Sequence, residues 1–302
     1  MNNTEHTPEA VAPDLETDIG LETQGQTLPR GVIIAATPLG NVHDASPRLR
    51  QALAQADVVA AEDTRRTRAL AAALDVQIRG RVISNFDHNE EGRVAQLLEA
   101  AQHGSVVVVS DAGMPVVSDP GLSLVNAAHE AGVPVTCFPG PSAVPTALAL
   151  SGLNVGKFAF DGFAPRKSGQ RREWLKSLKN EARAVCFFES PHRIADTLAD
   201  AVEVLGETRR AAVCRELSKT YEEVRRGSLA ELAEWARQGV RGEITVVLEG
   251  AGEEDVDVHA LVPAVEERVA EGERLKAVCK DIAATRGVSA RELYDAVLSA
   301  RG

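Results

Sequence analysis

The stretch VVVVSDAGMPVVSDPG, residues 106–121, joins a strand pattern to a loop of small residues. Four consecutive valines are typical of a strand that is covered on both faces. Directly after them come Ser110-Asp111-Ala112-Gly113-Met114-Pro115 and Ser118-Asp119-Pro120-Gly121, which contain no cation and little bulk. Small residues let a ligand approach the backbone closely, so the loop is a candidate binding element. The alternative is that it only forms a tight turn between a strand and a helix.

Strand and helix patterns alternate on both sides of this stretch. Short apolar runs lie at 32–36, 58–61, 82–84, 106–110 and 133–138, and helical patterns at 66–74, 94–102, 121–131 and 142–150. A further helix begins with Ser46 as N-cap and Pro47 at its first position. Apolar strands that alternate with helices predict a doubly wound α/β domain with a parallel sheet. Ligands bind such sheets beyond the carboxyl ends of the strands.

A second α/β unit follows in the sequence. We expect strands at 157–163, 184–188, 211–215, 222–225 and 243–249, and helices at 168–179, 191–205 and 229–238. Two strands in direct succession predict a mixed sheet, and Ser228 with Glu231 forms a capping box. The expected domains are a disordered acidic leader (1–29), the first α/β domain (30–152), the second (153–251), an acidic linker (252–260) and a helical tail (261–302). Amphipathic helices are expected in the tail at 275–285 and 290–299.

Composition indicates an ordinary globular chain of 302 residues with a net charge of −11. Much of this charge lies in residues 1–29 and 253–257, so it says little about the working surface. The four cysteines have no metal-ligand or disulfide spacing, which predicts no metal site and fits a reducing cytoplasm. No apolar run is long enough for a membrane span, so no membrane partner is expected.

The loops at the expected strand ends lack the common phosphate-binding motifs. The loop Thr37-Pro38-Leu39-Gly40-Asn41 has no GxGxxG pattern, and the chain has no Walker A motif. Asp111 can accept a hydrogen bond from a ribose or an amine, and Pro139-Gly140-Pro141-Ser142-Ala143 forms a second stiff turn. A neutral or cationic small molecule with a nucleoside part suits these groups, and a nicotinamide dehydrogenase is disfavoured.

Several motifs in order carry a family resemblance. They are Thr37-Pro38-Leu39-Gly40-Asn41, Ala61-Glu62-Asp63-Thr64-Arg65, the loop after residue 109, Phe138-Pro139-Gly140-Pro141-Ser142-Ala143, Gly162-Phe163-Ala164-Pro165-Arg166-Lys167, Glu189-Ser190-Pro191-His192-Arg193, Arg215-Glu216-Leu217-Ser218-Lys219 and Arg241-Gly242-Glu243. From residue 31 to residue 250 the chain resembles the ribosomal RNA small subunit methyltransferase I family, within the wider tetrapyrrole methylase fold. The tail also resembles the C-terminal segment of that family, whereas the acidic leader lies outside it.

The resemblance implies an enzyme that uses S-adenosylmethionine to methylate the ribose 2′-hydroxyl of a cytidine in 16S ribosomal RNA, near the decoding centre. It implies a two-domain α/β protein, usually a homodimer, that acts on this RNA or on the small ribosomal subunit. The expected cofactor-binding residues are Leu39, Asp111, Gly113, Met114, Val117, Ser142, Ala143 and Phe188. The wider fold often has Gly-Asp-Pro where this chain has Gly113-Met114-Pro115, which weakens the interpretation as a porphyrin methylase.

Four residues are candidates for the catalytic step: Glu62, Asp63, Arg65 and His88. A ribose hydroxyl is a weak nucleophile, so a general base or a nearby cation would accelerate transfer by about 10²–10⁴-fold. Asp63 has the alternative role of capping the following helix, and His88 that of a surface histidine. The sequence does not choose one base among them.

The expected RNA-binding residues are Arg166, Lys167, Arg171, Arg172, His192 and Arg193. The first four form a basic cluster that we interpret as a flexible loop that contacts phosphates, and the alternative is a solvated helix start. Two other functions remain open at this point. One is methylation of a tetrapyrrole or another small molecule, and the other is nucleic-acid binding through the tail without catalysis.

Overall fold

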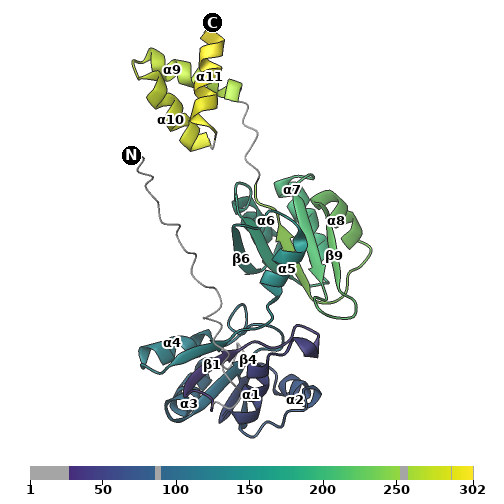
Figure 1. Cartoon of the computed structure of the whole chain (residues 1–302). Coiled ribbons are helices and arrows are strands. Elements are labelled where there is room, and N and C mark those ends of the chain that lie inside the picture. Colours follow the sequence, from purple (N-terminus) through teal and green to yellow (C-terminus); the bar gives the residue numbers. More distant parts are fainter. Residues whose placement is uncertain (1–26, 86–89, 252–257, 287, 302) are drawn as a thin grey trace, which may run out of the picture.

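The computed structural model describes residues 27–85, 90–251, 258–286 and 288–301, and it begins with a parallel five-stranded sheet (Figure 1). Its strands are β1 (Gly31–Ala35), β2 (Val58–Ala61), β3 (Arg81–Ser84), β4 (Ser105–Val109) and β5 (Val135–Phe138), in the spatial order β3-β2-β4-β1-β5. The predicted doubly wound parallel sheet is therefore confirmed. Because β1 and β4 are central neighbours, the loops that follow them lie side by side.

Helices cover both faces of this sheet, as the uninterrupted valines indicate. They are α1 (Pro47–Gln55) and α2 (Thr64–Ala73) on one face, and α3 (Glu90–His103) and α4 (Leu122–Glu130) on the other. Val107 and Val109 of β4 face the first pair, whereas Val106 and Val108 face the second. Full burial of a valine on either side stabilises the fold by about 1.5–3 kcal/mol.

A second five-stranded sheet is mixed, as predicted, with the order β6-β7-β10-β8-β9. Its strands are β6 (Phe158–Phe163), β7 (Ala184–Glu189), β8 (Arg210–Arg215), β9 (Glu223–Ser228) and β10 (Ile244–Leu248). Only the β6–β7 pair of this sheet is parallel. One face is covered by α6 (Ser168–Ser177), α7 (Ile194–Leu205) and α8 (Leu229–Ala236). The capping box of Ser228 and Glu231 at α8 is confirmed.

Helix α5 (Ala143–Ser151) connects the two sheets in an unexpected way. We expected it to belong to the first unit, since it follows β5. Instead its Val144, Ala147 and Leu148 pack on the second sheet, against Cys186 and Cys214 among others. The chain thus leaves the first sheet at β5 and enters the other core at once (Figure 1). The start of α5 therefore lies where the two sheets meet.

The tail contains the 3₁₀ helix η2 (Val258–Leu261) and the helices α9 (Val262–Ala270), α10 (Leu275–Arg286) and α11 (Ala290–Arg301). The last two were predicted, whereas α9 was missed. Together they form a core of their own around Val265, Val278 and Leu293. Within the described part of the chain, no helix is both long and apolar enough to cross a membrane.

Candidate functional site

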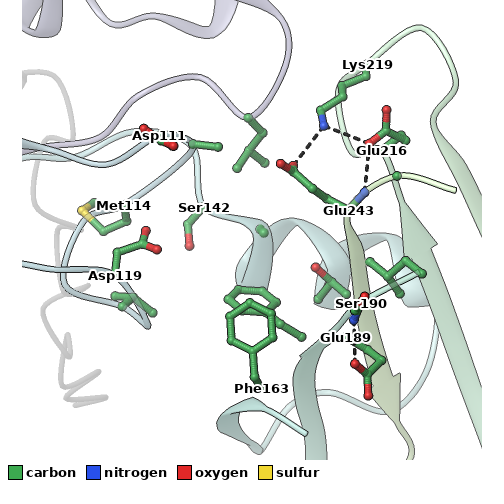
Figure 2. A pocket seen from close by; sticks show the side chains of 18 of the residues that line it. Asp111, Met114, Asp119, Ser142, Phe163, Glu189, Ser190, Glu216, Lys219 and Glu243 are labelled. Carbon is green, nitrogen blue, oxygen red and sulfur yellow. Dashed lines mark hydrogen bonds and ion pairs between the residues drawn. The ribbon is translucent and has the colours of Figure 1, made fainter. Parts of the chain in front are cut away.

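A cavity of about 660 Å³ lies between the two sheets, at the carboxyl ends of the first sheet's strands (Figure 2). Its size falls within the range of about 300–1,000 Å³ that is usual for small-molecule sites. The first sheet and the start of α5 supply Leu39, Glu62, Arg66, Asp111, Ala112, Met114, Val117, Asp119, Ser142 and Ala143. The second sheet and its loops supply Phe163, Phe188, Glu189, Ser190, Pro191, Glu216, Lys219, Gly242, Glu243, Ile244 and Thr245.

The small-residue loop after β4 is held by the loop after β1. Thr37 N–H donates to Gly113 O at 2.8 Å, and Gly113 N–H donates back to Thr37 O at 3.0 Å. Gly113 has φ +88°, and a Cβ there would lie 3.0 Å from a methyl group of Leu39. Gly113 itself does not line the cavity, but Ala112 and Met114 beside it do. The glycine thus positions Leu39 and the loop, which differs from the direct ligand contact that we expected.

The remainder of this loop forms one wall of the cavity. Met114, Val117 and Asp119 line it. Figure 2 shows Met114 and Asp119 on the first-sheet side. Val116 and Ser118 between them have φ values of +74° and +65°. Such conformations cost non-glycine residues on the order of 1–3 kcal/mol each, and strain of this kind concentrates at functional sites.

Polar residues at the ends of β2 and β4 form a hydrogen-bonded network. Asp111 N–H donates to Glu62 Oε2 at 3.0 Å, and Asp63 N–H donates to Asp111 Oδ1 at 3.1 Å. Arg66 pairs with the other carboxylate oxygen of Asp111 at 3.0 Å. Three of the four side chains, those of Glu62, Arg66 and Asp111, line the cavity. The network sets the orientation of the acidic groups at this end of the cavity.

The four catalytic candidates separate in the structure. Glu62 lines the cavity, whereas Asp63 and Arg65 do not. Asp63 is the N-cap of α2, as its alternative role predicted, and its carboxylate accepts from Arg65 N–H at 2.8 Å. The Arg65 guanidinium is 88% exposed and holds the pKa of Asp63 well below its usual range, so Asp63 is a weak base. His88 lies outside the described residues.

A buried carboxylate shapes the wall that the second sheet provides. Glu189, at the end of β7, is fully buried in its side chain and accepts from Ser190 N–H and Thr197 Oγ1, both at 2.6 Å. It also pairs with Arg193 at 2.5 Å. Helix α7 begins only at Ile194, three residues later than expected, because residues 190–193 form the turn around this carboxylate. The bonded Arg193 does not line the cavity, whereas Ser190 does.

A second polar cluster, which we did not assign from the sequence, lies at the opposite end of the cavity from Phe163 (Figure 2). Lys219 Nζ pairs with Glu216 Oε1 and Glu243 Oε2, both at 2.9 Å. Burial alone lowers the pKa of Lys219, but these hydrogen bonds more than offset it and the pKa lies above its usual value. Lys219 is therefore a cation at neutral pH. The motifs around residues 216 and 243 signalled the cluster, but not its function.

The charge of the lining favours a cationic ligand. Six acidic residues line the cavity, of which Glu189 has its carboxylate buried and paired with Arg193, and two cationic residues, Arg66 and Lys219, line it as well. The aromatic ring of Phe188 and the side chains of Leu39 and Met114 add apolar surface. A sulfonium nucleoside combines a positive centre and an amine with an aromatic base, so these residues fit its chemistry.

The prediction that Arg166, Lys167, Arg171 and Arg172 form a flexible basic loop is wrong in part. Residues 168–177 form α6, and the Arg171 side chain is only 6% exposed. Asp200 binds it at 2.6 Å and also binds Arg172, so Arg171 is unavailable to phosphates. A buried charge loses its hydration, and an oppositely charged partner offsets the free-energy cost of that loss. Arg166, Lys167 and His192 remain exposed.

Comparison with known proteins identifies the fold family of this chain. The family model "Tetrapyrrole (Corrin/Porphyrin) Methylases" matches residues 31–233. The crystal structure of the methyltransferase CobJ superposes with a TM-score of 0.55 at 20% identity, covering 74% of this chain and 95% of that one. The fold is therefore that of the tetrapyrrole methylases.

Relatives with higher sequence identity identify the family within this fold. Ribosomal RNA small subunit methyltransferase I of Mycobacterium tuberculosis (strain ATCC 25618 / H37Rv) is 59% identical over 89% of this chain and 95% of its own. The protein of that name from Halalkalibacterium halodurans is 42% identical over 87% of this chain and 92% of its own. The chain therefore belongs to the ribosomal RNA small subunit methyltransferase I family and is an S-adenosylmethionine-dependent methyltransferase.

Proposed function

We propose that this protein transfers the methyl group of S-adenosylmethionine to the ribose 2′-hydroxyl of a cytidine in 16S ribosomal RNA, near the decoding centre. The observation that carries the proposal is the cavity of about 660 Å³ with its acid-rich lining, at the carboxyl ends of β2 and β4. The names of the relatives support the RNA substrate. The cytidine and its position rest on the resemblance described above.

The donor-side residues act by alignment. The donor supplies an already activated methyl group, so the protein mainly has to hold the methyl carbon in line with the acceptor oxygen. Such alignment contributes up to about 7–11 kcal/mol in favourable cases. We assign Leu39, Ala112, Met114 and Ala143 to contacts along the donor, and the carboxylates of the lining to its positive groups.

The acceptor hydroxyl needs a proton acceptor or a nearby positive charge. Glu62 is the candidate base that lines the cavity, in contact with Asp111 N–H. Lys219 supplies a cation on the other side of the cavity, since its pKa is raised. The structure thus favours Glu62 over Asp63 among the carboxylates at the end of β2.

RNA phosphates require exposed cations outside the cavity. Arg166 and Lys167 are exposed, lie between β6 and α6, and make no ion pair with a carboxylate in the described part of the chain. We propose these two residues and His192 as the phosphate contacts of this face. A cytoplasmic homodimer that acts on RNA or on the assembled small subunit completes the proposal.

The decisive experiment uses labelled S-adenosylmethionine with three acceptors: small ribosomal subunits from cells that lack the gene, naked 16S RNA and a corrin precursor. We expect label in RNA, in a 2′-O-methylated cytidine after nuclease mapping. Label in the corrin precursor alone would contradict the proposal.

The double variant Arg166→Ala/Lys167→Ala should retain donor affinity and weaken RNA binding, with a shallower salt dependence.

A further inference from the structure

Phe163 is an aromatic side chain that the fold leaves exposed at the cavity. Its side chain lines the cavity, yet the residue is 60% exposed. Burying a phenylalanine stabilises a fold by about 1.5–3 kcal/mol, and this ring forgoes most of that gain. Aromatic residues make up only 4% of the chain, so an exposed one at the working cavity points to a ligand.

The ring is supported from behind. It meets the Phe188 ring edge-on with centroids 5.4 Å apart, and Phe188 in turn meets Phe160 at 5.0 Å. Phe163 ends β6, the edge strand of the second sheet, and Ala164 N–H donates to Phe188 O at 3.2 Å. These contacts hold the Phe163 ring in place and leave its outer surface exposed.

The backbone before the ring is also anchored. The pairing of β6 with β7 shifts register between Phe160 and Phe163, and this bulge contains Asp161 and Gly162. Trp174 Nε1–H donates to Asp161 at 2.8 Å. A Cβ on Gly162 would lie 3.2 Å from the hydroxyl oxygen of Ser118, so the bulge lies against the loop after β4. Bulges of this kind re-aim a side chain near a site.

The position of Phe163 separates it from the charged end of the cavity. In Figure 2 it lies at the end away from Lys219, Glu216 and Glu243, beside the loop that carries Asp119. Phe188, whose ring meets that of Phe163 edge-on, also lines the cavity and is less exposed. The exposed ring is therefore available to a group that enters from outside.

We infer that the Phe163 ring is the surface on which the nucleobase of the acceptor nucleotide stacks, and that this stacking positions its ribose at the donor. The inference rests on the proposed function. Sequence-specific RNA binding commonly stacks unpaired bases on aromatic side chains, at about 1–3 kcal/mol per base. A nucleotide in a single-stranded segment, turned out of its own base stack, supplies such a base. Stacking on the Phe163 ring requires no charged group.

The test compares Phe163→Ala, Phe163→Leu and Phe163→Trp. Phe158→Ala is the matched control, because Phe158 lies on the same strand, is 47% exposed and does not line the cavity. Three quantities are measured for each protein: the Kd for S-adenosylmethionine by calorimetry, and kcat and KM for small ribosomal subunits. We expect Phe163→Ala and Phe163→Leu to lower kcat/KM by about 10-fold to 100-fold, mostly through KM.

Phe163→Trp, which keeps a stacking surface, should retain most of the activity, and every variant should keep its donor Kd within about 2-fold of the parent, since stacking acts on RNA alone. A parallel loss of donor affinity in Phe163→Ala would assign the ring to the donor and overturn the inference. Full activity of Phe163→Leu, or of Phe163→Ala, would also overturn it. If the unchanged protein methylates no RNA, the proposed function fails as well. If it does and the variants match it, only this inference fails.

Discussion

Gly113 controls the loop that forms the first-sheet wall of the cavity, although it does not itself line the cavity. With φ +88° and a prospective Cβ only 3.0 Å from Leu39, it admits no side chain without displacing a lining residue. Gly113 is therefore required to be a glycine because the loops after β1 and β4 pack closely against each other at this position. The same glycine lets Thr37 and Gly113 exchange two backbone hydrogen bonds.

Gly113→Ala should weaken S-adenosylmethionine binding by about 10-fold, because it displaces Leu39, which lines the cavity, and strains the backbone. Calorimetry with the purified variant measures this. Gly132→Ala is the control, since Gly132 also has positive φ (+66°) but nothing within 4 Å of the added carbon. That variant should lose some stability and bind the donor normally. Equal donor affinities in Gly113→Ala and the parent protein would contradict the role given to Gly113.

At the scale of elements, helices α6 and α7 are joined by a buried ion cluster. Asp200 on α7 accepts from Arg171 Nε at 2.8 Å, from Arg172 Nε at 2.7 Å and from Ser168 Oγ at 3.2 Å, all on α6. Burial alone raises the pKa of Asp200, and the bonds from Arg172 and Arg171 outweigh it, so the pKa lies below the ordinary 3.8. The carboxylate is therefore charged at neutral pH.

Asp200→Asn should lower the free energy of unfolding at pH 7 by about 3 kcal/mol, since it leaves the buried Arg171 charge without its partner. A carboxylate with a depressed folded pKa stabilises the fold above its unfolded pKa, and this contribution is lost as the pH falls through the folded value. Urea unfolding at several pH values should therefore show a flatter pH dependence below about pH 5 in the variant than in the parent.

Glu203→Gln is the matched control for this cluster. Glu203 pairs with Arg172, whose side chain is 44% exposed, and is itself 58% exposed. Exposed pairs contribute little, so its effect should stay below about 1 kcal/mol. Similar losses in the two variants would show that burial of the Arg171–Asp200 pair is not what joins α6 to α7.

At the scale of the whole molecule, the cavity exists because loops from the two sheets contact each other. The Lys219 side chain lies directly over Gly40, where a Cβ would be 2.1 Å from its Cγ. Next to it, Asn41 N–H donates to Ser218 Oγ at 3.3 Å. These contacts join the loop after β1 to the loop after β8 at the charged end of the cavity.

Gly40→Ala should separate these two loops and reduce both donor affinity and methyl transfer, because the added carbon cannot coexist with the Lys219 stem in its present place. Calorimetry and the subunit assay measure the two effects. Gly169→Ala, on α6 with nothing within 4 Å, should bind the donor and transfer methyl groups like the parent. Normal binding by Gly40→Ala would mean that this contact does not maintain the cavity.

Much of the architecture was predictable because it is encoded locally. The runs of valine and alanine in β2 and β4 report strands covered on both faces, and Ser46, Ser228 and Pro47 mark helix starts. Motifs at the strand ends also indicated most of the first-sheet side of the cavity. Local patterns failed at residues 190–193, where a turn around the Glu189 carboxylate replaces the helix start that we expected at residue 191.

The sequence by itself determined the alternation of strands and helices, the two kinds of sheet and the family, since periodicity and ordered motifs are properties of neighbouring residues. Only the tertiary structure decided that Arg171 is buried against Asp200, that α5 packs on the second sheet, and that Lys219 lies over Gly40. The partners in these contacts lie far apart along the chain; Asn41 and Ser218, beside the contact of Gly40 with Lys219, are 177 residues apart. Which charge is buried and which faces a ligand depends on what the folded chain brings beside it.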